Sequence, residues 1–239
     1  MSGHSKWSKV KHQKATTDAV KSRAFTKASR GLTVSVREGG GITDPEKNFH
    51  LRLAIELARS VNMPKDTIER AIEKGAGVGA HAFEQLIYEG YGPGGVAYIV
   101  EAATDNHQRT GAEMKHQFDR SGGSLATPGA VSYQFQRNGV LLINKSSHAF
   151  DAVLEAALKA GADDVVERDD VFEVYTAVTG VASAKRELEA GGFAIEVMEL
   201  VHRPNVSVRP PEDIRALNEA LIESLEGLDD VQNVYTTME

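Results

Sequence analysis

The sequence predicts an α+β protein of three domains: an N-terminal helical bundle, a middle α+β domain, and a ferredoxin-like (βαββαβ) domain inserted into the middle one. Three observations predict this fold class. Apolar residues recur at helical spacing through the first 80 residues, β-rich runs follow a glycine-rich stretch at 75–79, and the element order from residue 139 to 200 is β-α-β-β-α-β. The expected boundaries are 1–79 for the bundle, 80–135 plus 205–239 for the middle domain, and 136–204 for the insertion.

The bundle is expected to contain three helices. The first runs from Asp18, as N-cap, to the stop at Gly39-Gly40-Gly41, and the second opens at Asp44-Pro45. Pro64 opens the third, which Gly75 and Gly77 end. The helical spacing predicts that the second helix buries one stripe of side chains, namely His50, Leu53, Ala54, Leu57, Ala58 and Val61.

Strands and helices alternate in the rest of the chain. The middle domain is expected to hold a strand at 96–102, a helix at 107–120 and a strand at 130–135. The insertion follows as strand 140–144, helix 148–160, strands 164–167 and 171–177, helix 181–190 and strand 194–200. A final helix at 211–225 and strand at 231–236 cannot bury a core alone, so they are expected to return to the segment 82–135.

Composition excludes several classes of site. The 239 residues include no cysteine, which excludes disulfides, thiolate zinc sites, iron–sulfur clusters and a cysteine nucleophile. No apolar run is long enough to span a bilayer, and the N-terminus lacks the apolar core of a signal peptide. We therefore expect a cytoplasmic protein with no membrane partner.

The net charge of −7 is the sum of a basic first part and an acidic second part of the chain. Residues 1–80 contain 15 basic and 8 acidic side chains, a net charge of +7, whereas residues 81–239 contain 12 and 26, a net charge of −14. Such a division predicts a basic module that binds polyanions, attached to an acidic body. The alternative is a lysine-rich helix face that is merely solvated.

Two segments of the middle domain could carry chemistry. Gly90–Gly95 matches the dinucleotide-binding pattern G-x-G-x-x-G, but a strand follows it rather than a helix, so we reject that site and expect a surface turn with Tyr91 and Pro93 available for contacts. Glu101, Asp105 and Asn106 could serve acid–base or magnesium chemistry, or could cap the helix at 107–120. A hydrolase or transferase that uses Glu101 and Asp105 is a remote alternative.

Metal binding is not expected. Glu113 and His116 have the spacing of a metal pair on one helix, but the eight histidines are scattered and no HExxH motif is present. We predict no enzymatic activity, no cofactor, no metal and no small-molecule substrate.

The N-terminal segment carries the candidate nucleic-acid contacts. The single tryptophan lies among cations, an arrangement in which the aromatic ring stacks on bases, or anchors the segment, while the cations meet phosphates. Helical geometry places Arg23, Lys27, Arg30 and Arg37 within an arc of about 80°, opposite the apolar stripe of their helix. The predicted nucleic-acid-binding residues are Lys6, Trp7, Lys9, Lys11, His12, Lys14, Arg23, Lys27 and Arg30.

Several longer segments carry a family resemblance: GHSKW (3–7), FTKASRGLTVSVREGG (25–40), NMPKDTIERAI (62–72), YEGYGPGGVA (88–97), TDN with RT (104–106, 109–110) and a GG-L-G-V pattern across 122–131. On these segments the sequence resembles the YebC/PmpR-type proteins, which include the mitochondrial translational activator of cytochrome oxidase. The chain departs from the common pattern at Gln13, Gly31, His107-Gln108, Ala126 and Ala130, and this removes two cations.

The resemblance implies the same three domains and no established enzymatic activity. Some members have been described as transcriptional regulators that bind promoter DNA. Others resemble translation factors that act on the ribosome and assist it through proline-rich sequences. The partner is thus expected to be promoter DNA or ribosomal RNA, with the ribosome itself as a further partner. On a ribosome the expected loop contacts are Met63, Pro64, Lys65, Tyr91, Gly92, Pro93, Gly94 and Gly95.

Overall fold

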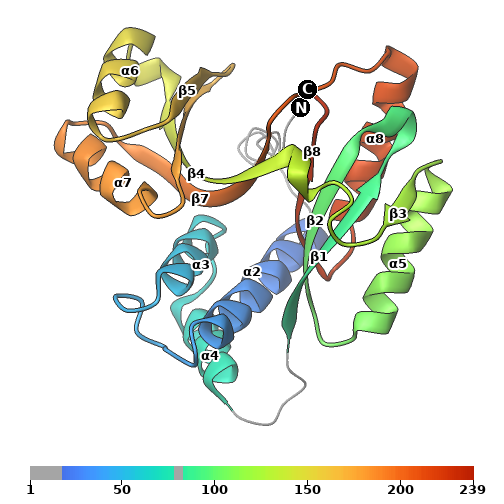
Figure 1. The fold of residues 1–239 in the computed structure, drawn as a ribbon. Coiled ribbons are helices and arrows are strands. Elements are labelled where there is room, and N and C mark those ends of the chain that lie inside the picture. Colours follow the sequence, from blue (N-terminus) through green and yellow to red (C-terminus); the bar gives the residue numbers. More distant parts are fainter. Residues whose placement is uncertain (1–17, 78–82) are drawn as a thin grey trace. The chain divides into compact units, whose positions relative to one another are not determined.

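The computed structural model describes residues 18–77 and 83–239 and has the predicted mixed α+β class (Figure 1). The chain forms two compact units. Unit 1 comprises the described residues up to Gln134 together with Val206–Glu239, and unit 2 comprises Phe135–Asn205. No helix in the described part of the chain is long and apolar enough to cross a membrane.

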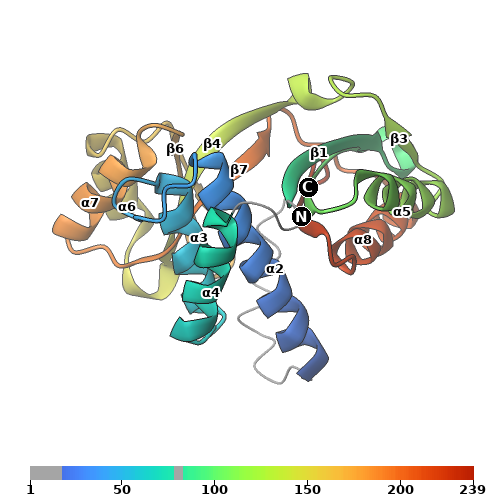
Figure 2. The ribbon, with the colours of Figure 1, turned by 90° about the horizontal axis from the view of Figure 1, so that it is seen from below.

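Three helices form the N-terminal part of unit 1: α2 (Asp18–Glu38), α3 (Phe49–Ser60) and α4 (Lys65–Ala76). Both shorter helices pack against α2 (Figure 2). Their shared core consists of Ala28, Leu32, Val36, Leu51, Ala58, Met63, Ile68 and Ala71.

The start and the buried face of α3 differ from the prediction. Asn48, not Asp44, is the N-cap, because its side chain accepts a hydrogen bond from the main-chain N–H of Leu51. The helix buries Leu51 and Ala58, whereas His50 is exposed and Leu57 is 45% exposed, so the predicted buried stripe was wrong at these two positions. Gly75 lies within α4 and does not end it.

The middle sheet of unit 1 has the strand order β3-β1-β2-β8 with antiparallel neighbours. Its strands are β1 (Glu84–Tyr91), β2 (Ala97–Thr104), β3 (Ser124–Ala126) and β8 (Val231–Thr236). The last strand pairs with β2, which confirms that the C-terminal segment returns to this domain. The prediction had missed β1 and β3, and its strand at 130–135 was wrong, because Ser132–Gln134 forms a short 3₁₀ turn.

Two helices, α5 (His107–Arg120) and α8 (Glu212–Glu226), lie on the same face of the middle sheet (Figures 1 and 2). They enclose a core in which Met114 and Phe118 of α5 and Leu221 and Leu225 of α8 meet Tyr98 and its neighbours on the sheet. The core of this domain therefore needs residues from both sides of unit 2 in the sequence.

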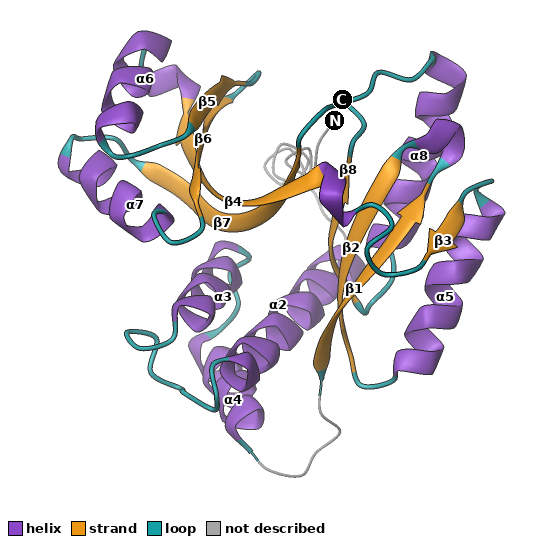
Figure 3. Cartoon of the chain, in the orientation of Figure 1, coloured by secondary structure: helices purple, strands orange, loops and turns teal. Residues whose placement is uncertain are grey.

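Unit 2 is a four-stranded antiparallel sheet with the order β5-β6-β4-β7 and two helices (Figure 3). This is the strand order of a split βαβ arrangement, as the element order predicted. The elements are β4 (Phe135–Asn144), α6 (Phe150–Lys159), β5 (Asp164–Glu167), β6 (Val171–Ala177), α7 (Val181–Ala190) and β7 (Ile195–Pro204).

Candidate nucleic-acid interface

Most of the predicted nucleic-acid contacts lie outside the described residues. These are Lys6, Trp7, Lys9, Lys11, His12 and Lys14. Arg23 lies in α2, but the placement of its side chain is not described. The assignment of these seven residues to a nucleic acid therefore stays a prediction from the sequence.

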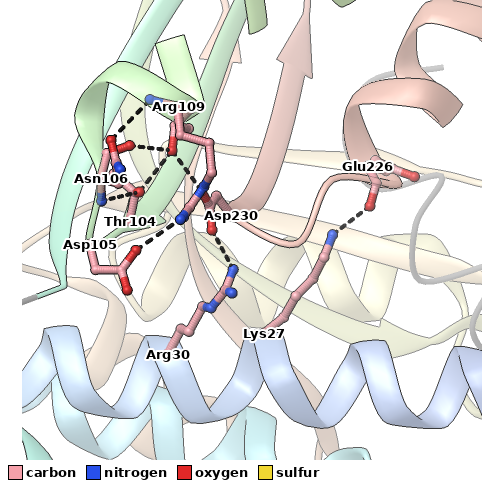
Figure 4. Close-up of polar contacts among 9 residues, drawn as sticks. Lys27, Arg30, Thr104, Asp105, Asn106, Arg109, Glu226 and Asp230 are labelled. Carbon is pink, nitrogen blue, oxygen red and sulfur yellow. Dashed lines mark hydrogen bonds and ion pairs between the residues drawn. The ribbon is translucent and has the colours of Figure 1, made fainter. Parts of the chain in front are cut away.

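The structure brings the other two, Lys27 and Arg30, onto the C-terminal segment of the chain (Figure 4). Lys27 Nζ donates to the main-chain carbonyl oxygen of Glu226 at 2.6 Å, and Arg30 Nη1 contacts Asp230 Oδ1 at 2.7 Å. The side chain of Arg30 is 17% exposed and that of Asp230 is 3% exposed. Both of these cations therefore have an acceptor within the chain, which the sequence analysis did not predict.

Asp230 is the centre of a wider hydrogen-bonded cluster. Its Oδ2 accepts from Arg109 Nη2 at 2.8 Å and from Thr110 Oγ1 at 2.6 Å, both on α5. Burial alone would raise the pKa of Asp230, but these hydrogen bonds and the nearby charges of Arg30 and Arg109 outweigh it and lower the pKa. The carboxylate is therefore held in its ionised form.

The TDN-RT segment forms the rest of this cluster. Asn106 is the N-cap of α5, since its Oδ1 accepts from the main-chain N–H of Arg109 at 3.0 Å. Asp105 forms an ion pair with Arg109 Nη2 at 3.0 Å, and Thr104 Oγ1 donates to Thr110 Oγ1 at 2.7 Å, because the one hydroxyl proton of Thr110 is donated to Asp230. Capping was one of the two uses expected for this segment, and the structure gives that role to Asn106.

Glu101 has a structural partner as well. It is 6% exposed in β2, and Oε2 accepts from Asn233 Nδ2 of β8 at 2.9 Å. The pair of carboxylates considered for acid–base chemistry thus engages side chains of its own domain. Among residues 18–77 and 83–239, no group of three histidine or acidic residues could hold a metal ion.

The glycine-rich turn joins β1 to β2 in an antiparallel hairpin, so a strand follows it, as the sequence predicted. Gly94 and Gly95 are exposed with positive φ angles of 71° and 78°. Pro93 was expected to be available for contacts, but it is buried and its carbonyl accepts from Asn218 Nδ2. Gly92 is also buried, and Tyr91 is half-buried with its hydroxyl donating to the carbonyl of Ala130.

In the loop before α4, too, some of the predicted contact residues are buried and others are exposed. Met63 is 5% exposed and belongs to the core of the helical bundle. Pro64 and Lys65 are exposed. The surfaces that these two loops offer to a partner are therefore Pro64 with Lys65, and Gly94 with Gly95.

Sequence reasoning missed Asp230 and Glu89, two buried carboxylates that each accept several hydrogen bonds. Glu89 in β1 accepts from the main-chain N–H groups of Gly129, Val131 and Ser132. Asp230 is 200 residues from Arg30. Glu89 lies in the segment 88–97 that carries the family resemblance, but its donors follow about 40 residues later, so the segment alone does not indicate its role. Asp230 belongs to none of the segments that the sequence analysis singled out.

Comparison with known proteins gives a consistent result over the whole chain. Residues 5–78 match the family model described as TACO1/YebC protein N-terminal domain, and residues 83–238 match TACO1/YebC second and third domain. A relative from Acetivibrio thermocellus, named probable transcriptional regulatory protein, is 46% identical over 239 residues, which cover 98% of each chain. One of the same name from Persephonella marina is 44% identical and covers 100% of this chain and 96% of its own.

A solved structure agrees with these matches. It is the crystal structure of a conserved hypothetical protein from Aquifex aeolicus, which is 40% identical, has a TM-score of 0.87, and covers 95% of this chain and 93% of its own. The chain belongs to the TACO1/YebC family.

Proposed function

We propose that this protein is a non-enzymatic cytoplasmic regulator of gene expression that binds nucleic acid, promoter DNA in the first instance, through its basic N-terminal module. The observation that carries the proposal is the division of charge, +7 over residues 1–80 against −14 over residues 81–239. A polyanion is attracted to the first part and repelled by the second. The printed name of the relatives, probable transcriptional regulatory protein, supports the same role.

The contacts are assigned by residue type. Lys6, Lys9, Lys11, Lys14 and Arg23 bind phosphates, His12 lies among them, and Trp7 stacks on bases or anchors the segment. Lys27 and Arg30 are assigned to the same surface, although both have acceptors within the chain. The sequence does not resemble a DNA-reading helix with asparagine, glutamine and arginine placed to contact base edges, so we expect weak sequence specificity.

Salt dependence tests the electrostatic basis of the proposal. If the five cations other than Lys27 and Arg30 neutralise phosphates of a duplex, the logarithm of the affinity falls with the logarithm of salt concentration at a slope of about −4.5. Fluorescence anisotropy with a labelled duplex between low and moderate salt measures that slope. A slope near zero contradicts phosphate binding by this segment.

A pair of charge-reversal variants locates the binding surface. Lys9→Glu with Lys11→Glu is expected to abolish binding, because it replaces two phosphate contacts by two repulsive charges. The matched control, Lys115→Glu with Lys159→Glu, makes the same change in net charge at two exposed lysines outside the basic module. Equal losses in both variants would show a general effect of net charge rather than a binding surface.

Ribosomal RNA is the second candidate target, in the role of a translation factor that relieves ribosomes stalled on proline-rich sequences. The observation that favours it is the acidic body, which comprises the middle domain and unit 2 and suits a large ribonucleoprotein with protein and RNA surfaces better than a bare duplex. The exposed residues Pro64, Lys65, Gly94 and Gly95 would then be contact points. Crosslinking in cells, followed by sequencing of DNA and RNA in parallel, distinguishes promoters from discrete positions in ribosomal RNA.

A second pair of substitutions tests the alternative that the protein is an enzyme that uses Glu101 and Asp105. Glu101→Gln with Asp105→Asn is expected to leave nucleic-acid binding intact, because both carboxylates bind side chains within the middle domain. If the protein is instead a scaffold for protein interactions, neither this carboxylate pair nor the pair Lys9→Glu with Lys11→Glu changes polyanion binding. Loss of binding in the carboxylate variant but not in the lysine variant would overturn the assignment.

A further inference from the structure

Lys27 and Arg30 meet acceptors that resemble the oxygens of a phosphate group. Arg30 contacts the carboxylate of Asp230, and Lys27 donates to a carbonyl in the last turn of α8, where main-chain carbonyls have no partner within the helix (Figure 4). A guanidinium binds carboxylate and phosphate oxygens with the same planar geometry, and an ammonium binds either as a point charge. Two cations assigned to nucleic acid are thus held by oxygens of the chain itself.

The acceptor side of this contact stays satisfied without α2. Asp230 keeps Arg109 Nη2 and Thr110 Oγ1 as donors, and both of these residues lie on α5 of the middle domain. Withdrawal of Arg30 therefore does not leave a buried carboxylate without a partner, which is the costly outcome when a buried ion pair is broken. The contact is built so that Arg30 is the partner that can leave.

The surrounding charges favour competition by a polyanion. Residues 212–230 contain seven acidic side chains and one basic, whereas α2 contains five basic side chains and two acidic. The attraction between these segments weakens as salt screens it. A nucleic acid presents a dense row of phosphates to the same cations and adds those of the N-terminal segment to its contacts.

We propose that Lys27 and Arg30, with Glu226 and Asp230, form a latch that joins α2 to the α8–β8 segment in the free protein and that nucleic acid opens by taking over the two cations. The inference rests on the proposed function, since nucleic acid is the competitor. Because these two cations bind phosphate only in the open state, the latch lowers the apparent affinity by the fraction of molecules that are open.

The first test removes the acceptor charge. Asp230→Asn is expected to tighten binding to a mixed-sequence duplex of about 30 base pairs by roughly 3- to 10-fold, because more molecules are already open. Asp229→Asn is the matched control, since it removes one negative charge from the same loop at an exposed position. It is expected to change the affinity by less than about 2-fold, the effect of one distant charge under screening.

The second test follows the latch directly and does not depend on how well Asp230→Asn folds. The cysteine-free chain allows spin labels at Ala76→Cys in α4 and Ala220→Cys in α8, both exposed and uncharged positions. Electron paramagnetic resonance then gives the distribution of distances between the labels. Adding the duplex is expected to shift that distribution in the otherwise unaltered protein.

The outcomes separate the latch from the proposed function. If the duplex binds while the distance distribution stays unchanged, the latch is wrong and nucleic-acid binding stands. Equal affinities of the two aspartate variants, where both are folded, lead to the same conclusion. If the duplex binds to neither the unaltered protein nor Asp230→Asn, the proposed binding of promoter DNA is wrong, and a latch opened by duplex DNA is excluded with it.

Discussion

Glu89 is a carboxylate that holds a loop through main-chain donors. It is 6% exposed, and it accepts from Gly129 and Val131 at 2.7 Å each and from Ser132 at 3.0 Å. Burial alone would raise the pKa of Glu89, but these hydrogen bonds outweigh it and lower the pKa below its ordinary value. The ionised carboxylate therefore stabilises the segment that leads into unit 2.

The sign of this pKa shift predicts how stability depends on pH. A lowered pKa means that Glu89 stabilises the fold above the ordinary glutamate pKa, about 4.3, and loses that contribution as the pH falls through this value towards the folded pKa. Glu89→Gln turns one acceptor into a donor, so we expect it to lower the free energy of unfolding at neutral pH by about 1–3 kcal/mol. Urea unfolding at neutral and acidic pH should show a weaker acid dependence in the variant, and identical pH profiles would contradict the role.

Two glycines in helices predict opposite effects of the same substitution. A Cβ at Gly31 would meet Gln232 Oε1 at an ordinary 3.8 Å, whereas at Gly75 it would lie 2.8 Å from both Thr33 O and Val36 Cβ. Gly31→Ala is therefore expected to stabilise the protein by about 0.5–1 kcal/mol, the difference in helix propensity. Gly75→Ala is expected to destabilise it, and unfolding midpoints of the two variants that move in the same direction would contradict this.

At the scale of elements, α3 shows which features of a helix can be predicted from its sequence and which cannot. Apolar residues cover more than half of its circumference, so two phases of the buried stripe fit the sequence FHLRLAIELARS. Packing against α2 selects Leu51 and Ala58 and leaves Leu57 exposed. Existence and type of this helix could be predicted, but its buried face depends on contacts with another helix.

The strand β1 was missed for a related reason. Its residues do not alternate between buried and exposed, because the end of the strand is buried on both sides. Gly90 lies against Phe118, where a Cβ would come within 2.7 Å of the ring. A glycine with this role weakens the strand pattern in the sequence while it permits close packing in the fold. The uninterrupted periodic segments at 107–120, 164–167, 171–177 and 181–190 were predicted with the observed bounds.

The observed cap of α3 makes a direct prediction. Asn48 accepts from Leu51 N and its amide donates to the carbonyls of Ser35 and Ile42, so Asn48→Ala removes a cap together with two further hydrogen bonds. We expect a loss of about 2 kcal/mol in the free energy of unfolding, at the upper end for N-caps. Asp44→Ala, at the position where the sequence suggested the cap, should cost markedly less in the same denaturant titration, and the reverse order would contradict the assignment.

At the scale of the whole molecule, the sequence predicted the modules better than the contacts between them. The ferredoxin-like order and the return of the C-terminal helix and strand follow from the order of elements. The cluster around Asp230 does not, because it joins α2, α5 and the segment before β8, which are distant in the chain. Charge patterning identified Lys27 and Arg30 as a group but could not show that the chain supplies their acceptors, a main-chain carbonyl for Lys27 and a carboxylate for Arg30.

The ends of unit 2 predict that it can be removed. Phe135 and Pro204 are paired neighbours in β4 and β7, so the chain enters and leaves unit 2 at adjacent positions about 5 Å apart. Replacing residues 135–204 by a linker of about three residues should leave unit 1 folded, with a cooperative unfolding transition by circular dichroism. Truncation after Asn205 should instead unfold the middle domain, because α8 and β8 supply part of its core. Survival of the truncated domain would contradict this division.

The placement of β8 also sets an order of events during synthesis. On the ribosome, unit 2 is complete while the middle sheet still lacks β8, and the core around Tyr98 closes only after residues 212–236 have been made. Lys27 and Arg30 emerge long before Glu226 and Asp230, which are their partners in the finished chain. The nascent protein therefore passes through a stage in which its basic helix is exposed to the RNA of the machine that makes it.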